Sequence, residues 1–83
     1  MEYEKLGLYI QNKRKNCGFS LNEFAFENGI DSAILSRIEN LKQNIKINIL
    51  EKIANGFKMT PAQFLTEFEN SDFAITTKHP NRF

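Results

Sequence analysis

The chain has 83 residues, of which 41% are hydrophobic and 25% are charged, and its formal net charge is +1. This length allows one small hydrophobic core and leaves little room for a large catalytic cleft or a second domain. A single cysteine and a single histidine rule out an intrachain disulfide and a cysteine-rich metal site, so we expect neither metal nor cofactor.

The sequence also lacks the run of about 20 apolar residues that a membrane span requires, and its N-terminus lacks the apolar segment of a signal peptide. We therefore expect a cytoplasmic protein with no membrane partner.

A first helix is indicated where Leu6, Ile10 and Arg14 recur at helical steps. Gly18 should end this helix, because glycine readily adopts the left-handed backbone of a helix C-terminus. Cys17 follows the same apolar pattern, so it is predicted to pack in the core and not to act as a redox sensor.

A second helix should follow the stretch "SLNE". Ser20 can accept a hydrogen bond from the amide of Glu23 while the Glu23 carboxylate reaches back, which makes a capping box. The helix directs Phe24 and Ala25 inward and should end at "ENG", where Gly29 tolerates left-handed backbone.

Asp31 offers an N-cap for a third helix, predicted from Ser32 to about Asn40 with Leu35 and Ile38 facing inward. Only two or three residues separate the second and third helices. A connection of this length suits two helices that cross steeply.

The apolar residues of "IKINILEKIANGF" recur at steps of three and four and predict a fourth helix, which Gly56 should close. The fifth helix should begin at "TPAQ". There Thr60 is the N-cap, Pro61 takes the first helical position and Gln63 completes a second capping box. Helical periodicity is lost from Glu69 onward. The pattern predicts an all-α fold with one domain at 1–68 and a C-terminal tail at 69–83, partly ordered or associated with a dimer partner.

The connection between the second and third helices reads "FAFENGIDSAILSRIEN". The small Ala25 lets the helices approach, Gly29 turns the corner and Leu35 fills the angle between them. With these residues the chain resembles the Cro and phage-repressor type, or xenobiotic-response-element (XRE) family, of helix-turn-helix DNA-binding domains. The similarity extends from about Ile10 to Leu65. It implies a compact five-helix lambda-repressor-like domain whose helix-turn-helix is formed by the second and third helices.

The resemblance also implies that the third helix lies in the DNA major groove and that homodimers read a two-fold symmetric operator. Of the matching positions, Arg37 should carry most specificity, because a guanidinium can donate two hydrogen bonds to guanine O6 and N7. The positions that match base contacts are Ser32, Ala33, Ser36 and Arg37. Candidates for phosphate contacts, which fix the register without reading sequence, are Ser20, Asn40, Lys42, Asn44 and Lys46.

Glu39 matches a family glutamate that pairs with an arginine of the first helix, here Arg14, in a partly buried structural ion pair. Four residues depart from the family pattern, namely Leu21, Asn28, Leu41 and Lys46. Leu21 replaces a glutamine that grips a phosphate, and Leu41 replaces the glycine that commonly ends the recognition helix. A left-handed leucine costs about 1 to 2 kcal/mol, so we expect Asn40 to take the turn instead.

The dimer interface is predicted on the fifth helix and its surroundings, at Met59, Phe64, Phe68, Phe73 and Ile75. The sequence contains no catalytic constellation, so we expect no enzyme activity and no small-molecule ligand. The stretches "AFENGID" and "IANGFKM" are most similar to the small controller proteins of restriction-modification systems. A transcriptional regulator that binds double-stranded DNA is the leading hypothesis. The alternative is a protein-interaction module, an antitoxin or adaptor, with a helix-turn-helix fold and weak DNA binding.

Overall fold

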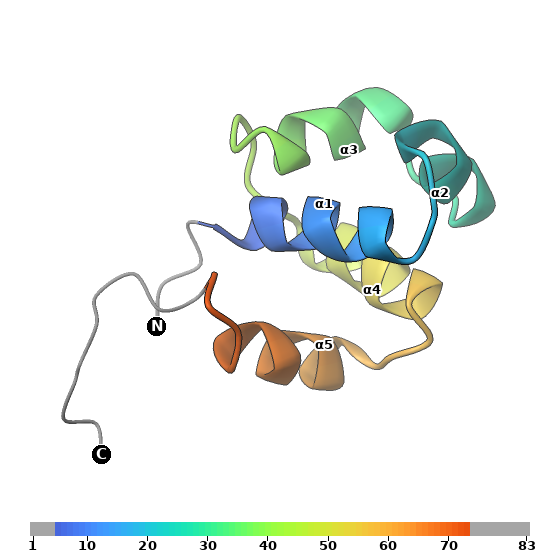
Figure 1. Ribbon diagram of the computed structural model, residues 1–83. Helices are drawn as coiled ribbons and strands as arrows, with labels where there is room; N and C mark the ends of the chain where they lie inside the picture. Colours follow the sequence, from blue (N-terminus) through green and yellow to red (C-terminus); the bar gives the residue numbers. More distant parts are fainter. Residues whose placement is uncertain (1–4, 74–83) are drawn as a thin grey trace, which may run out of the picture.

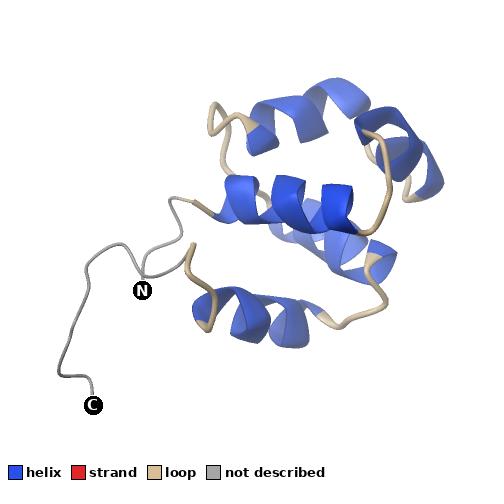
Figure 2. Ribbon diagram, in the orientation of Figure 1, coloured by secondary structure: helices blue, strands red, loops and turns tan. Residues whose placement is uncertain are grey.

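The computed structural model describes residues 5–73 of the chain and places five α-helices there, as the sequence predicts (Figure 1). The helices are α1 (Leu6–Asn16), α2 (Leu21–Glu27), α3 (Ser32–Glu39), α4 (Ile47–Gly56) and α5 (Pro61–Glu69). Figure 2 shows that the segments between them are loops and that the described part of the chain contains no strand.

Helix α1 lies in the middle of the domain, with α3 above it and α5 below it in the view of Figure 1. Every helix contributes to a single hydrophobic core. Its largest fully buried apolar side chains are Ile10, Phe24, Leu35, Ile38, Ile53, Phe64 and Phe68. Because α1 contacts both α3 and α5, the first helix fixes the position of the third within the fold.

Two helices begin with the predicted capping boxes. At α2, Ser20 Oγ accepts from the Glu23 amide and the Glu23 carboxylate accepts from the Ser20 amide, both at 3.0 Å. At α5, Thr60 and Gln63 form the same reciprocal pair at 2.9 and 3.0 Å. Each box satisfies two amides that the first turn of a helix would otherwise leave unpaired.

The first four helices all end in the same way. A residue with positive φ follows the C-cap, and the next amide donates to the carbonyl five residues earlier, which defines a Schellman motif. The four left-handed residues are Gly18, Gly29, Leu41 and Lys58, with φ of 85°, 68°, 61° and 62°. The two glycine turns confirm the sequence prediction.

The end of α3 was predicted wrongly. Leu41 takes the left-handed backbone at φ 61°, whereas Asn40 has an ordinary φ of −94°. Two hydrogen bonds stabilise this turn, from the Leu41 amide to Ile38 O at 3.1 Å and from the Lys42 amide to Arg37 O at 2.8 Å. The Leu41 side chain also lies over Gly7 of α1, and this packing helps to offset the strain of the leucine.

Gly56 is the last residue of α4, as predicted. The left-handed residue of this helix end is Lys58, two residues later. Glycine is needed at position 56 for packing, because an ideal Cβ there would lie 2.7 Å from both Phe24 Cζ and Asn28 Nδ2.

Aromatic side chains join α1 to α5. The Tyr9 ring lies 5.6 Å from that of Phe64, 5.4 Å from that of Phe68 and 5.7 Å from that of Phe73, measured between centroids. Phe64 and Phe68 are fully buried by these contacts. Their prediction as dimer-interface residues is therefore wrong, since the domain's own core leaves no part of them for a partner.

The other predicted interface residues fall into two groups. Met59 and Phe73 are half-buried and keep some accessible surface, whereas Ile75 lies outside the described residues, as does the rest of the predicted tail from position 74. Cys17 is exposed, so its prediction as a core residue is also wrong. It is the C-cap of α1, after the last residue that the helix directs toward the core.

Candidate nucleic-acid interface

The corner between α2 and α3 has the predicted construction. Ala25 and Leu35 are buried where the two helices meet, and Gly29 turns the chain with φ 68°. Lys52 of α4 donates from Nζ to the Gly29 carbonyl at 3.0 Å, so a hydrogen bond from a third helix also stabilises the turn. A cation at this point is favourable because α2 ends there with partial negative charge.

The N-terminus of α3 is fixed by Asp31. Its Oδ1 accepts from the amide of Ala33 at 2.8 Å and from that of Ile34 at 3.3 Å. The predicted N-cap is thus confirmed, and the carboxylate also complements the positive end of the helix dipole.

The C-terminal half of α3 is fixed to α1 by the predicted ion pair. Arg14 Nε and Nη2 donate to Glu39 Oε2 and Oε1, each at 2.8 Å, and Nη1 donates to the Phe19 carbonyl at 2.7 Å. Arg14 is 4% exposed and Glu39 1% exposed, so the pair is fully buried where the sequence predicted partial burial. The hydrogen-bonded Glu39 carboxylate raises the pKa of Arg14, which keeps the guanidinium charged.

The four predicted base-contacting residues lie on one side of α3. Ser32, Ala33 and Arg37 are exposed and Ser36 is half-buried. They occupy positions i, i+1, i+4 and i+5, which share one side of a helix. The helix therefore presents a short polar surface with a single charged side chain. The contact of these residues with bases stays a prediction.

Arg37 has a partner that the sequence did not indicate. Its Nε donates to the side-chain carbonyl Oε1 of Gln43 at 2.8 Å, from the loop after α3. Gln43 is half-buried. Within residues 5–73, neither terminal nitrogen of Arg37 has a hydrogen-bond partner.

The predicted phosphate-contacting residues lie at the N-cap of α2 and in the connection from α3 to α4. Asn40 donates from Nδ2 to the Ser36 carbonyl at 2.9 Å, so the side chain is ordered before any ligand binds. Ser20 accepts in the capping box and keeps its hydroxyl hydrogen for another acceptor. The remaining candidates are exposed, namely Lys42, Asn44 and Lys46.

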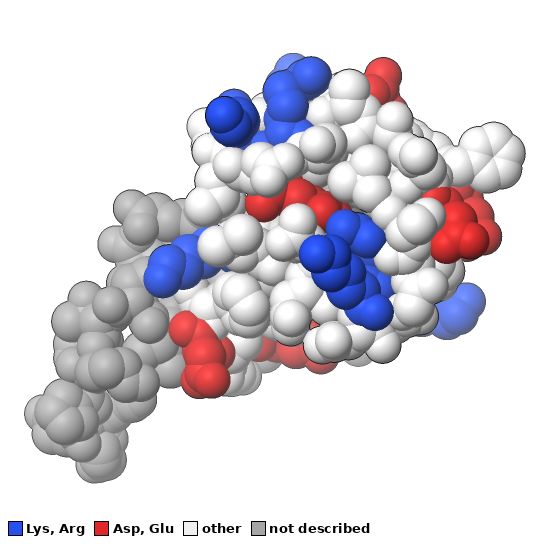
Figure 3. All heavy atoms as spheres, turned by 45° about the horizontal axis from the view of Figure 1, so that its top comes forward, with Lys and Arg blue, Asp and Glu red and all other residues white. Residues whose placement is uncertain are grey.

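Beyond the acidic N-cap Asp31, the exposed charges along α3 and the loop after it are all basic. From Ser32 to Lys46 the exposed charged side chains are Arg37, Lys42 and Lys46, and the acidic Glu39 is buried and neutralised by Arg14. Figure 3 shows two basic groups toward the top of the view and one acidic group at its top right, with the larger acidic groups at the right and lower left. The surface beside α3 can therefore attract phosphate although the chain as a whole is nearly neutral.

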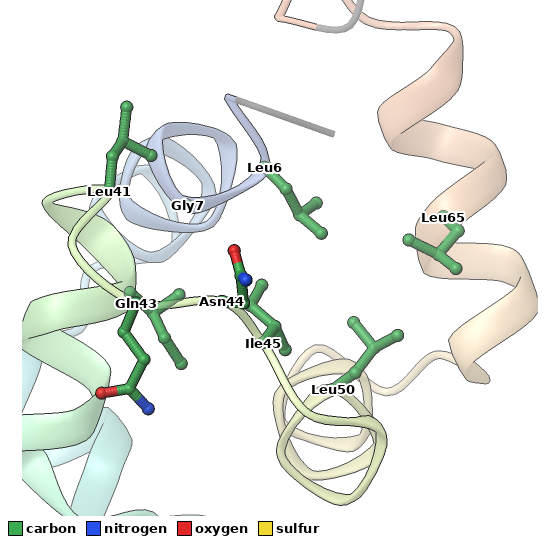
Figure 4. A pocket seen from close by; sticks show the side chains of 9 residues that line it. Leu6, Gly7, Leu41, Gln43, Asn44, Ile45, Leu50 and Leu65 are labelled. Carbon is green, nitrogen blue, oxygen red and sulfur yellow. The ribbon is translucent and has the colours of Figure 1, made fainter. Parts of the chain in front are cut away.

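An apolar groove of about 400 Å³ opens beside the end of α3. Figure 4 shows Leu6, Leu50 and Leu65 lining it from three different helices, with Ile45 on the connecting loop. Among residues 5–73 no group of acidic, histidine or cysteine side chains could hold a metal ion, and no helix is both long and apolar enough to cross a bilayer.

A steep pair of short helices, with the second exposing a polar and basic face, defines a helix-turn-helix DNA-binding domain. The sequence comparisons agree, and the chain belongs to the helix-turn-helix family of the Cro and phage-repressor type, whose model matches residues 10–64. This is a family of DNA-binding proteins and not of enzymes, as the sequence predicts.

Among curated proteins, the chain is similar to the HTH-type transcriptional regulator SinR of Bacillus licheniformis. The two are 33% identical over 69 residues, which make up 82% of this chain and 62% of that regulator. The chain thus spans less than two thirds of the relative's length. No solved structure matches the chain. The similarity to restriction-modification controller proteins stays a prediction.

Proposed function

We propose that the protein is a transcriptional regulator that binds a two-fold symmetric operator as a homodimer, with α3 in the major groove. The observation that carries this proposal is the exposed face of α3, on a helix fixed at one end by Asp31 and at the other by the Arg14–Glu39 pair. Such rigid placement suits a recognition helix, because even a small displacement of the contacting side chains impairs their hydrogen bonds to the bases.

Each residue of the face has a role in this proposal. Arg37 binds a guanine through its terminal nitrogens, Ser32 and Ser36 reach a base edge or a phosphate, and Ala33 contacts a thymine methyl. The phosphate contacts come from the ends of the helix pair and the loop after α3. They are Ser20, Asn40, Lys42, Asn44 and Lys46.

Dimerisation is part of the proposal because α3 has only eight residues and can read only a few base pairs. Of the described residues, Met59 and Phe73 remain candidates for the interface. Sedimentation equilibrium of the full chain tests this step, and a monomer at the concentration that saturates an operator would contradict it.

The DNA proposal is tested by selecting sites from random duplexes with the purified chain and then measuring affinity as a function of salt. We expect a two-fold symmetric consensus and a steep fall in affinity as salt rises, since phosphate contacts release counterions. Arg37→Ala should weaken binding to the selected site by about 1 to 3 kcal/mol and relax the preference at one base pair per half-site. An unchanged preference would refute the role of Arg37.

A second function, that of a protein-interaction module, is favoured by one observation. Phe26 on the outer side of α2 is 87% exposed, which is unusual for so large an apolar side chain. If the wild-type chain binds no duplex more tightly than bulk DNA at moderate salt, the protein-interaction module explains the protein better than a sequence-specific DNA-binding regulator does.

A further inference from the structure

We propose that Gln43 is a positioning residue for Arg37, holding the guanidinium in the orientation that reads a guanine. This inference rests on the proposed DNA-binding function. Its structural basis is the 2.8 Å hydrogen bond from Arg37 Nε to Gln43 Oε1.

The geometry of a guanidinium makes the choice of nitrogen important. Arginine has five N–H donors in a planar fork, of which only one is on Nε. The bond to Gln43 uses that one donor and leaves the four on the two terminal nitrogens of Arg37. With Nε occupied, those two nitrogens are the pair left to donate side by side to O6 and N7 of guanine.

The backbone turn after α3 brings Gln43 to Arg37. With Leu41 in the left-handed conformation, the Lys42 amide donates back to the Arg37 carbonyl at 2.8 Å, so the chain reverses over the last turn of the helix. Gln43 is the next residue. In Figure 4 the Gln43 side chain points away from the groove, on the side opposite to Leu6 and Leu65. The strained leucine turn thus places an acceptor beside the arginine.

A neutral acceptor also suits the task better than a carboxylate. Gln43 orders Arg37 without cancelling the positive charge that attracts the phosphate backbone. Long arginine side chains lose substantial rotamer freedom on binding, and a side chain already held loses less. The one carboxylate on α3, that of Glu39, already forms an ion pair with Arg14.

The first experiment uses the free protein. Nitrogen-detected NMR follows exchange of the Arg37 Nε proton in the wild type, in Gln43→Ala and in Asn12→Ala, a control that removes an exposed amide on α1. The buried Arg14 Nε proton provides a slow internal reference. We expect Gln43→Ala alone to accelerate exchange at Arg37. Equal exchange in all three proteins would overturn the proposal.

The second experiment is a double-mutant cycle on the duplex selected by the wild-type chain and on a non-specific duplex. Gln43→Ala should weaken binding to the selected duplex about three- to tenfold, the range of one net hydrogen bond. Binding to the non-specific duplex should change much less. In an Arg37→Ala background the same substitution should have no further effect.

Two results of the cycle would overturn the proposal. An equal loss on both duplexes would mean that Gln43 acts on phosphate or on the fold. An undiminished loss in the Arg37→Ala background would mean that Gln43 contacts DNA independently. Failure of the proposed function can be distinguished from failure of the positioning role, because the wild-type chain itself would then select no duplex. In that case the positioning role would also be refuted, whatever the exchange data show.

Discussion

Gly7 of α1 lies directly against the backbone of α3 at Ile38. An ideal Cβ built on Gly7 would be 1.9 Å from the Ile38 carbonyl oxygen, far inside van der Waals contact. The two helices therefore meet here backbone to backbone, and only glycine permits the distance. This contact and the Arg14–Glu39 pair lie on the same two helices, so α1 determines where the recognition helix sits.

Gly7→Ala should lower the free energy of unfolding by about 1 to 3 kcal/mol, because the backbone of α3 has to move to admit the methyl group. Chemical denaturation measures the loss as a lower midpoint with an unchanged slope. Asn12→Ala, at an exposed position of the same helix, is the control and should be nearly neutral. A Gly7→Ala protein as stable as this control would show that α1 and α3 can separate without cost.

The Arg14–Glu39 pair predicts a non-additive pattern of stability. Glu39→Ala strands a buried guanidinium and should cost about 3 to 5 kcal/mol. Arg14→Ala should cost a similar amount, because it strands the carboxylate and also removes the bond to the Phe19 carbonyl. The double substitution Arg14→Met with Glu39→Leu should cost less than either single one, since no buried charge remains. Denaturation midpoints of the three variants test the pattern, which a double variant less stable than either single one would contradict.

The features that the sequence predicted correctly depend on neighbouring residues. The capping boxes at Ser20 and Thr60 and the glycine turns at Gly18 and Gly29 each follow from a few consecutive side chains. The helix-turn-helix corner has the same origin, with Gly29 between two short apolar patterns. Local chemistry of this kind is visible without a fold.

The features that the sequence missed depend on what packs against a residue from elsewhere in the chain. Gly7 and Gly56 look like poor helix residues until Ile38 and Phe24 are placed against them. Leu41 accepts a left-handed backbone because of hydrogen bonds and a contact with α1. The contact of Gln43 with Arg37 had no sequence signal, since it depends on that turn. Helical periodicity indicated an apolar face on α5 but not that Phe64 and Phe68 on this face are completely buried within the domain.

Lys58 offers a test of how much strain the helix ends contain. Its backbone has φ 62° and its side chain is exposed, so Lys58→Gly should relieve strain at little other cost. After allowing for the greater freedom of glycine in the unfolded chain, we expect a gain of about 0.5 to 1 kcal/mol in the free energy of unfolding. Lys58→Ala keeps the Cβ and should give no such gain. A Lys58→Gly protein no more stable than Lys58→Ala would contradict the expected gain, because the strain relieved would then not exceed the cost of glycine's freedom in the unfolded chain.

The contacts of Glu67 indicate that the folded protein loses stability in acid. Tyr9 donates its hydroxyl hydrogen to Glu67, and Lys13 Nζ lies 2.9 Å from the same carboxylate oxygen. The Tyr9 hydrogen bond is the largest cause that lowers the pKa of Glu67, and the Lys13 charge adds to it. Burial, followed by the contact with Glu67, raises the pKa of Tyr9, so the phenol stays protonated as the donor.

Because the folded-state pKa of Glu67 lies below that of the unfolded chain, its contribution is complete above the unfolded value of about 4.3 and is lost as pH falls through the lower folded value. Denaturation midpoints at pH 7 and at pH 3 measure the loss. Tyr9→Phe removes the largest cause of the shift, so this variant should lose less stability between the two pH values than the wild type. Glu51→Gln, at an exposed position of α4, is the control and should lose as much as the wild type. If Tyr9→Phe behaves like this control, then the contact between α1 and α5 makes no contribution to the acid sensitivity.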